Sequence, residues 1–186
     1  CSLTAPGEHT LLLGGSGTGT YNLYVQRLND PLNCTPVGFG VSLSDTISPV
    51  GELGCFTFPG AVSDRMRVRI TSTSGLFVSD VEIYDPDGTT RCSTIFSDDT
   101  CSLTATGQHT LLIGGSGTGT YNLYVQRLND PLNCVTLVPD VFATDTLMPV
   151  GKLGCYVFDG TGGQQVSLRV QSPVFINELS VYAPDG

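Results

Sequence analysis

Residues Asp64–Thr71 read DRMRVRIT, and this stretch decides the fold class of the chain. In an extended backbone Met66, Val68 and Ile70 point to one side, and the intervening arginines point to the other. An alternation of this kind, with a single apolar face, is typical of an antiparallel strand that is buried on one side. The stretch therefore predicts a strand that covers a hydrophobic core.

Comparable stretches lie on both sides of this strand. Val81 and Ile83 alternate with Glu82 and Tyr84, and the DPDG sequence that follows is a turn signal. The further strands that we expect are Val37–Leu43, Leu53–Phe58, Asp80–Tyr84, Thr90–Ile95, His109–Ile113 and Gly119–Leu128. Seven or eight short strands at intervals of roughly ten residues predict an all-β fold, an antiparallel β-sandwich of about 100 residues.

The sequence also repeats itself. Residues Cys1–Cys34 recur as Cys101–Cys134, so the period is 100 residues. The two copies differ at three positions, Pro6/Thr106, Glu8/Gln108 and Leu13/Ile113. Two later stretches match more loosely, Gly51–Gly60 with Gly151–Gly160 and Ile83–Gly88 with Val181–Gly186. Long self-similarity at a fixed period predicts a tandem array of sandwiches.

The register of this repeat divides the chain into three parts. We expect residues 1–28 to be the C-terminal part of a preceding repeat, residues 29–128 a complete sandwich, and residues 129–186 the N-terminal part of a following repeat. The chain is then a window of a longer polypeptide, or its ends are completed by neighbouring molecules. Because the two partial repeats complement each other, we expect segments to assemble head to tail, as a homopolymer or a continuous array.

Charge and hydropathy limit the classes of partner. Lys and Arg total 8 against 17 Asp and Glu, a net charge of −9. An acidic surface repels a phosphate backbone, so we expect no nucleic acid partner. No run of about eighteen apolar residues predicts a span, so we expect no membrane insertion. Nothing in the sequence calls for a cofactor.

The seven cysteines indicate disulfides. They form no CxxC motif and do not group with histidines, so zinc binding is not expected. Cysteines at this density are typical of secreted, extracellular proteins, because disulfides persist in oxidising compartments.

The cysteine spacing favours one pairing over a rival. The short loop CSTIFSDDTC brings its two ends together, and a second bridge would join the linker to the first core strand. The favoured pairs are Cys92–Cys101, Cys34–Cys55 and Cys134–Cys155, with Cys1 unpaired in this segment. The rival pairs are Cys55–Cys92, Cys101–Cys134 and Cys1–Cys34, with Cys155 left over.

The order of the motifs points to a family. They are, in sequence, G-x-x-x-x-Y-x-F, R-V-R-I, Y-D-P-D-G-T-T, T-G-x-H-T-L and G-S-G-T-G-T-Y-N-L-Y-V. This order resembles the bacterial pre-peptidase C-terminal domain across the complete repeat and both partial ones. The resemblance implies a jelly-roll-like β-sandwich, itself non-catalytic, that is appended to secreted bacterial proteins, often enzymes. Some members of the family bind collagen or polysaccharide, and some bind calcium.

This sequence departs from the family at one strand. The family usually has an Asp before the Tyr/Trp-x-Phe strand, whereas Leu-Gly-Cys precedes Phe56 and Tyr156 here. The cysteine makes this a disulfide-bearing variant of the domain.

Catalytic signals are weak, and we expect no enzyme. His9 and His109 occupy the same position of two repeats, so they do not form a pair. The Gly14–Gly19 run GGSGTG is neither a nucleophile elbow nor a phosphate-binding loop, and it predicts a hairpin turn.

Carboxylates are the candidates for a metal ligand. Asp85 and Asp87 in DPDG, and Asp98 and Asp99 in SDDT, could supply oxygen ligands to calcium. The alternative is turn chemistry, in which Asp bonds its own backbone. Ala183 stands where the second copy would have Asp85, which weakens the calcium hypothesis.

Two functions fit these patterns. The first is a structural segment of an extracellular fibre, stalk or large bacterial surface protein. The near-identity of the two copies then has two explanations, either recent recombination within the array or a contact of Thr20–Leu28 and its copy with the same neighbouring surface. The second is an accessory module of a secreted hydrolase that binds collagen, another matrix protein or a glycan. The second function predicts an exposed aromatic platform, for which Tyr24 and Tyr124 are the candidates.

Overall fold

The computed structural model describes residues 2–75, 77–93, 98–173, 176 and 178–186. Within these residues the protein is all-β, with eleven strands and no helix. The first nine are β1 (Thr35–Pro36), β2 (Ser42–Ile47), β3 (Gly54–Gly60), β4 (Arg65–Ser74), β5 (Phe77–Tyr84), β6 (Thr90–Cys92), β7 (Asp98–Ser102), β8 (Gly107–Ser116) and β9 (Gly119–Arg127). Two short strands follow, β10 (Val135–Thr136) and β11 (Tyr156–Val157).

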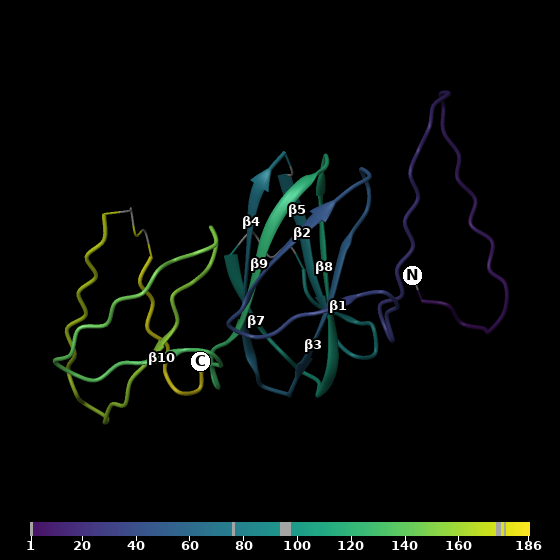
Figure 1. Ribbon diagram of the computed structural model, residues 1–186. Coiled ribbons are helices and arrows are strands. Elements are labelled where there is room, and N and C mark those ends of the chain that lie inside the picture. The colour runs from purple at the N-terminus through teal and green to yellow at the C-terminus, as the bar shows by residue number, and fades with distance from the viewer. Residues whose placement is uncertain (1, 76, 94–97, 174–175, 177) are drawn as a thin grey trace.

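The first nine strands form a sandwich of two sheets (Figure 1). One sheet has the order β1-β3-β8-β5-β6, and the other has the order β2-β9-β4-β7. All neighbours are antiparallel except β1 and β3. The sandwich therefore lies within residues 29–128.

The core fills the space between the two sheets. Met66, Val68 and Ile70 of β4 are buried there, as the alternation of this strand predicts. Phe56 on β3 and Leu111 on β8 are buried in the same cluster. Burial of an apolar side chain of this size contributes roughly 1.5–3 kcal/mol, so the core is the main source of stability.

The β8–β9 hairpin supplies the central strand of both sheets. β8 pairs with β3 and β5, and β9 pairs with β2 and β4. Gly117 has a φ of +89° in the turn between the two strands, a conformation that favours glycine. The Gly-rich run at residues 114–119 thus contains the turn that carries the chain from one sheet to the other.

One predicted strand needs correction, a second is described only in part, and one observed strand was not predicted. The strand expected at Val37–Leu43 begins only at Ser42, because the chain turns at Gly40, where φ is +72° and the N–H bonds to the Val125 carbonyl. β6 covers the first part of the strand expected at 90–95, and residues 94 and 95 lie outside the described residues. β7, which we did not expect, pairs with β4 and contains Asp98.

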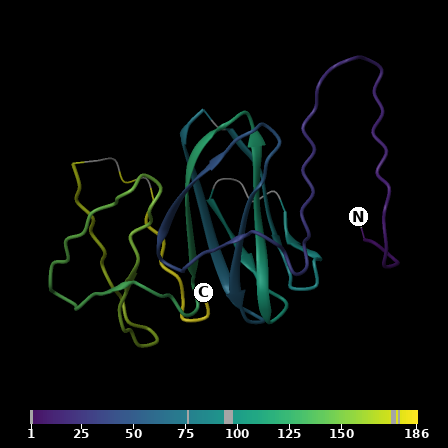
Figure 2. The ribbon, with the colours of Figure 1, turned by 45° about the vertical axis from the view of Figure 1, so that its right-hand side comes forward.

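Two regions flank the sandwich. The N-terminal loop (residues 7–27) and the C-terminal segment (residues 129–186) lie on opposite sides of it in both views (Figures 1 and 2). The C-terminal segment repeats local features of the complete unit, since β10 pairs with β11 in parallel as β1 pairs with β3. No helix that could cross a membrane occurs in the described part of the chain.

Candidate functional site

The most developed polar site is the junction between the sandwich and the C-terminal segment. Gln126 stands on β9 with its side chain directed away from the core, yet it is buried. Its Nε2 atom donates to the Leu132 carbonyl at 2.8 Å and lies 3.4 Å from the sulfur atoms of both Cys134 and Cys155. One side chain of the sandwich therefore holds both the linker and the disulfide of the next repeat.

A second contact fixes the same junction. Asn122, on the same face of β9, donates from Nδ2 to the carbonyl of Val150 at 2.7 Å. Thr71 of β4 lies so close to Gly151 that a Cβ at that glycine would come within 2.5 Å of the threonine hydroxyl. A turn of the C-terminal segment thus packs directly on the outer face of the β2-β9-β4-β7 sheet.

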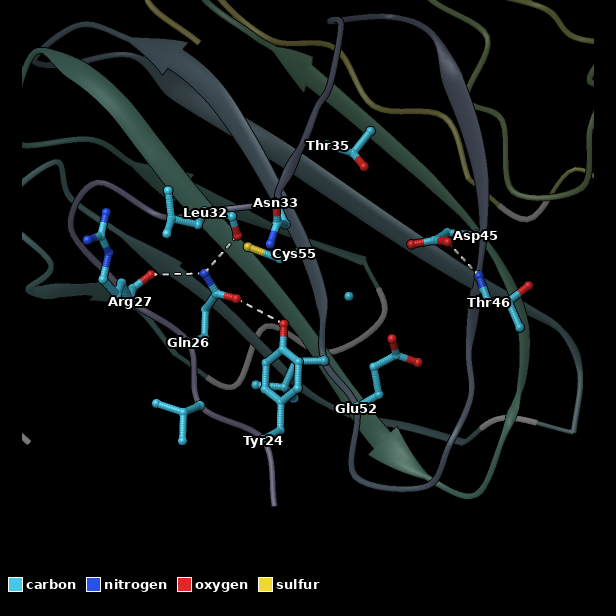
Figure 3. A pocket seen from close by; sticks show the side chains of 13 residues that line it. Tyr24, Gln26, Arg27, Leu32, Asn33, Thr35, Asp45, Thr46, Glu52 and Cys55 are labelled. Atoms are coloured by element: carbon cyan, nitrogen blue, oxygen red, sulfur yellow. Dashed lines mark hydrogen bonds between the residues drawn. The ribbon is translucent and has the colours of Figure 1, made fainter. Parts of the chain in front are cut away.

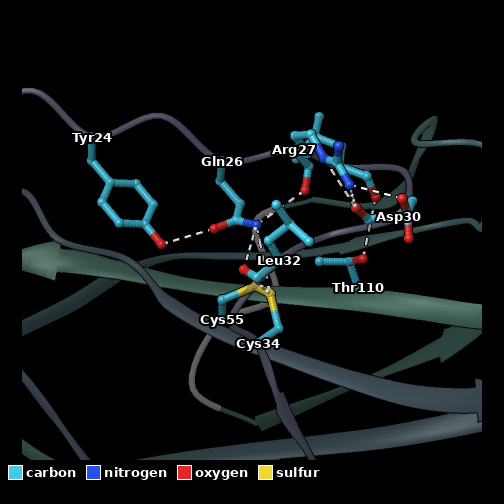
Figure 4. Close-up of a disulfide and its surroundings, with 9 residues drawn as sticks. Tyr24, Gln26, Arg27, Asp30, Leu32, Cys34, Cys55 and Thr110 are labelled. Atoms are coloured by element: carbon cyan, nitrogen blue, oxygen red, sulfur yellow. Dashed lines mark hydrogen bonds and ion pairs between the residues drawn. A yellow bond between two sulfur atoms is a disulfide. The ribbon is translucent and has the colours of Figure 1, made fainter.

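The preceding junction repeats the asparagine contact and part of the glutamine contact, and Figure 4 draws the latter. Asn22 Nδ2 donates to the Val50 carbonyl, also at 2.7 Å. Gln26 Nε2 points to the Leu32 carbonyl at 3.5 Å and to the Cys34 sulfur at 3.6 Å. The nearly unchanged half of each repeat therefore meets the following repeat in the same way twice, as expected for Thr20–Leu28 and its copy.

An arginine on β4 adds an ionic contact to the downstream junction. Arg67 Nε donates to Asp98 Oδ1 at 2.9 Å, and its other nitrogen atoms bond Glu178 and the Tyr182 hydroxyl. The hydrogen bond that Arg67 donates to Asp98 is the largest cause that raises the pKa of Arg67, and the nearby negative groups raise it further. This guanidinium is largely buried, so its pairs are screened less than exposed ones.

The proposed aromatic platform is wrong for Tyr124. This residue stands between Asn122 and Gln126 on the outer face of β9 and is only 2 % exposed, because the following segment covers that face. Burial raises the pKa of its phenol. Tyr24 is also followed by a segment that packs against it, but residues 20–27 have no strands beside them. Its side chain is 38 % exposed.

A pocket of about 520 Å³ lies at the preceding junction (Figure 3). Tyr24 and Gln26, whose side chains share a 2.9 Å hydrogen bond, form one side of it, and Asp45, Thr46 and Glu52 form the other. In the complete sandwich, β9 has β2 and β4 as neighbours at the equivalent place. The exposed side of Tyr24 is thus the side on which residues 20–27 have no strand partner in the described chain.

Three disulfides cross-link the described residues. The pairs are Cys34–Cys55, Cys92–Cys101 and Cys134–Cys155. They are the pairs that the spacing favours, and none of the rival pairs occurs among the described cysteines. Cys1 lies outside the described residues. Disulfides of this number indicate an oxidising compartment, either extracellular or periplasmic.

The candidate calcium ligands are engaged with protein donors. Asp85 is buried and accepts from His109 Nε2 at 3.1 Å and from the Thr104 hydroxyl at 2.9 Å. Asp87 accepts from the backbone and the hydroxyl of Thr89, which lowers the pKa of this carboxyl. Among the described residues, no group of three or more His, Cys, Asp or Glu side chains could hold a metal ion.

Asp98 and Asp99 also have other roles. Both belong to β7 instead of a turn, opposite Arg69 and Val68 of β4. The Asp98 carboxylate pairs with Arg67, and the Asp99 carboxylate accepts from the backbone of Thr100.

The two candidate histidines have different surroundings. His109 is buried, stacks on Phe58 with ring centroids 5.5 Å apart, and bonds Asp85. His9 is exposed, and its Nδ1 atom lies 3.0 Å from the carbonyl oxygen of Gly7. A histidine enclosed by an aromatic ring and a carboxylate has a structural role in the core.

Sequence reasoning missed most of the junction. The alternation in β4 predicts only that Arg67 points away from the apolar face, and no pattern in the sequence marks Glu178. One signal was available for Asn122 and Gln126, since both are polar, face away from the core and are unchanged between the two copies. The segment that packs on that face could not be predicted from the sequence, because the contact depends on how successive repeats pack.

Comparison with known proteins finds similar structures but no similar sequences. No family model matches the chain, and no curated protein matches it. The pre-peptidase C-terminal domain of a Bacillus anthracis collagenase is 14% identical, with a TM-score of 0.43, and the match covers 53% of this chain and 99% of that one. It represents the family that the sequence motifs resemble.

Two periplasmic inhibitors of g-type lysozyme, called PliG, are also similar. The inhibitor from Aeromonas hydrophila is 13% identical, with a TM-score of 0.39, and the one from Salmonella Typhimurium is 17% identical, with the same score. Each match covers 50% of this chain and 96% of the inhibitor.

Proposed function

We propose that this chain is a non-catalytic segment of an extracellular rod or stalk, built of sandwiches that are held in a fixed orientation by their junctions. The observation that carries the proposal is the repetition of one contact. Asn22 bonds Val50 and Asn122 bonds Val150 with the same atoms at the same 2.7 Å. If every junction repeats this geometry, each unit is related to the next by the same operation, which generates an extended assembly.

Burial of polar groups makes the junction specific. Asn122 and Gln126 are buried on the outer face of β9, and their amides bond mainly to the following segment. A buried polar group without its partner costs about 1–3 kcal/mol. The sandwich therefore favours the orientation in which the following repeat supplies these acceptors.

The linker also limits motion between units. Pro131 restricts the backbone φ in the short stretch between β9 and the disulfide cysteine Cys134. Arg127 bonds the carbonyl and the carboxylate of Asp130, and Arg27 does the same with Asp30. A short linker that contains Pro and is cross-linked at its end favours a semi-rigid rod over loosely joined beads.

A concatenated protein with several copies of residues 29–128 tests the proposal. Electron microscopy is expected to show straight particles with a regular axial repeat. The double substitution N122A/Q126A in every unit removes the contacts to the following repeat and is expected to give bent particles with a broad range of end-to-end distances. The matched control is Thr118→Ala in the exposed β8–β9 turn, which should leave the rods unchanged.

The alternative function is tested on the same protein. If the concatenated protein shows no preferred shape and instead binds collagen or a glycan, the accessory-module function replaces the rod. A bacterial cell-surface location belongs to the proposal as well, and immunolabelling of intact cells of the source organism would test it.

A further inference from the structure

Both outer faces of the sandwich contain buried side chains, although these side chains point away from the core. Along β3, β8 and β9 they alternate with the residues of the hydrophobic core. The buried outward side chains are Thr57, Thr110 and Leu112 on one sheet and Asn122, Tyr124 and Gln126 on the other. The outward side chains of a free sandwich contact solvent. Each outer face is therefore covered by another part of the chain.

The stretch that precedes β1 covers the β1-β3-β8-β5-β6 sheet. Thr110 Oγ1 on β8 donates to the Leu28 carbonyl at 3.2 Å, and Thr110 lies beside Arg27 in Figure 4. Asn22, the copy of Asn122, bonds the Val50 carbonyl in the turn before β3. The copy of β9 and the linker that follows it thus meet this sheet.

The C-terminal segment covers the other sheet, and it stands on the side of β4, β7 and β9 in Figure 1. Gln126 lies close to one of its cysteines, and Arg67 bonds two of its polar side chains. The contacted residues correspond to outward residues of β3 and β5 in the complete repeat. They are Cys155, Glu178 and Tyr182, in the positions of Cys55, Asp80 and Tyr84. The segment therefore presents the equivalent of the outer face of the β1-β3-β8-β5-β6 sheet.

The path of the linker agrees with this arrangement. After β9 the chain turns back, so that the Leu132 carbonyl and the Cys134 sulfur lie against Gln126 on the outer face of the same strand. A linker that joined two sandwiches end to end would leave β9 along the strand direction. Here the linker carries the chain to the layer above the sheet.

The two outer faces carry opposite charges. Arg67 and Arg69 point outward from β4, and Asp80 and Glu82 point outward from β5 in the other sheet. At the downstream junction Glu178 stands in the position of Asp80, bonds Arg67 and has its Oε2 atom 3.9 Å from Arg69 Nη1. Complementary charges favour contact between unlike faces and disfavour contact between like faces.

We propose that successive repeats stack sheet on sheet, with the basic outer face of the β2-β9-β4-β7 sheet of one repeat against the acidic outer face of the β1-β3-β8-β5-β6 sheet of the next. The proposal rests on the proposed rod and states in which direction its repeats follow one another. Packed sheets lie about 10 Å apart, so a repeat of two sheets adds about 20 Å to the rod. Repeats joined end to end would add about 33 Å, the length of a strand of 10 residues such as β4.

Hydroxyl-radical footprinting of the full chain tests whether the outer face is covered. The radicals oxidise side chains that solvent reaches, and mass spectrometry measures the rate at each tyrosine. Tyr124 on the outer face is expected to react as slowly as Tyr121 in the core and much more slowly than Tyr21. The expected rates follow the exposed fractions, which are 2 % for Tyr124, 0 % for Tyr121 and 71 % for Tyr21.

A charge reversal tests the complementarity of the two faces. Glu178→Arg places a positive charge against Arg67 and Arg69, so the oxidation rate of Tyr124 should rise toward that of Tyr21. Tyr121 should stay protected, which shows that the sandwich remains folded. Asp159→Arg is the matched control, because it makes the same charge change at an exposed position of the same segment and should leave Tyr124 protected. The stacking is overturned if Tyr124 of the unsubstituted chain reacts like Tyr21, or if the two variants give equal rates.

A lengthened chain tests the rise per repeat. One, two or three additional copies of residues 29–128 are inserted after Leu128 of the full chain, and small-angle X-ray scattering gives the maximum dimension. Each inserted copy is expected to add about 20 Å. An increment of about 33 Å would contradict the stacking and leave the rod in place. Copies that add no fixed length would instead contradict the rod itself, and the stacking with it.

Discussion

Two stretches of the chain, residues 107–127 and residues 7–27, have nearly the same sequence but different structures. The first stretch forms β8 and β9 in the middle of the sandwich, and the second is an exposed loop without strand pairing. Leu123 is 1 % exposed, whereas Leu23 is 57 % exposed. Since only two positions differ, local propensity cannot account for the contrast. The neighbouring strands β2, β3, β4 and β5 decide whether this sequence is a strand pair.

The contrast shows what the hairpin needs from the rest of the repeat. A β-hairpin alone is marginally stable in water, and it needs further strands that cover its apolar face. In this protein those strands come from the part of the repeat that precedes the hairpin in sequence. A sandwich is therefore complete only where both parts of the repeat meet, as they do in residues 29–128.

The largest effect on stability is expected when a charge is placed at equivalent positions of the two copies, Leu123 and Leu23. Leu123→Asp places a carboxylate in the core without a partner, which should cost about 4 kcal/mol or more and unfold the sandwich. Thermal denaturation followed by circular dichroism measures this loss. Leu23→Asp is the matched control, and its thermal transition should equal that of the unsubstituted chain at low concentration. Equal losses in both variants would show that the N-terminal loop contributes to the folded core.

The disulfides extend the comparison from the hairpin to the rest of the repeat. Replacement of Cys34 and Cys55 by Ala opens a loop with a sequence separation of 21 residues inside the complete sandwich. The entropy of that loop predicts a loss of about 3 kcal/mol in the free energy of unfolding. Chemical denaturation with urea measures it.

The equivalent bridge of the C-terminal segment is the control. Replacement of Cys134 and Cys155 by Ala opens a loop of the same separation outside the complete sandwich. This variant should unfold at the same urea concentration as the parent chain. A large shift in its midpoint would mean that the C-terminal segment and the sandwich unfold as one cooperative unit.

The sequence predicted the parts of the fold that depend on alternation. Met66, Val68 and Ile70 showed which face of their strand is buried, and the DPDG turn marked the end of the next strand. Two strands were misplaced or missed for local reasons. Gly40 turns the chain within an apolar run, and the two adjacent aspartates of β7 resemble a turn although they lie opposite Arg69 and Val68 of β4.

The junction could not be predicted in the same way, because it depends on contacts between repeats. Alternation placed Tyr124 on the outer face of its strand, which is correct. The prediction that Tyr124 is exposed on that face is wrong, since the following repeat covers it. Arg67 shows the same limit, because its partner Glu178 belongs to the next repeat. Burial on the outer face of a sheet is set by its neighbours and leaves no periodic signal in the strand.

A smaller effect is expected at the buried histidine. Asp85→Ala leaves His109 Nε2 and the Thr104 hydroxyl without their acceptor, which should cost about 2 kcal/mol. Urea denaturation of the sandwich measures the loss. Asp87→Ala in the same turn is the control, because Asp87 bonds only the exposed Thr89, and it should change stability little. If both substitutions have the same effect, the turn itself, and not the contact with His109, stabilises this end of the sandwich.

The smallest effect on stability is expected at Tyr121, near the start of β9, and its copy Tyr21 is the control. Tyr121 is buried in the core, and its hydroxyl donates to Asp45 Oδ2 at 3.1 Å. Tyr121→Phe removes this hydrogen bond and should cost about 1 kcal/mol at neutral pH, measured by urea denaturation. Tyr21 is exposed, so Tyr21→Phe should leave the stability unchanged.

The same pair of variants should differ in alkaline solution. Burial, and then the charge of Asp45, raises the pKa of Tyr121 above its ordinary value of about 10. The folded state therefore favours the neutral phenol, and its contribution to stability is complete below about pH 10 and decreases as the pH rises further, because the unfolded state ionises first. Tyr121→Phe should lose stability less steeply above this pH than either the parent chain or Tyr21→Phe. Equal slopes in all three proteins would show that the Tyr121 phenol is no better protected from solvent than its copy in the N-terminal loop.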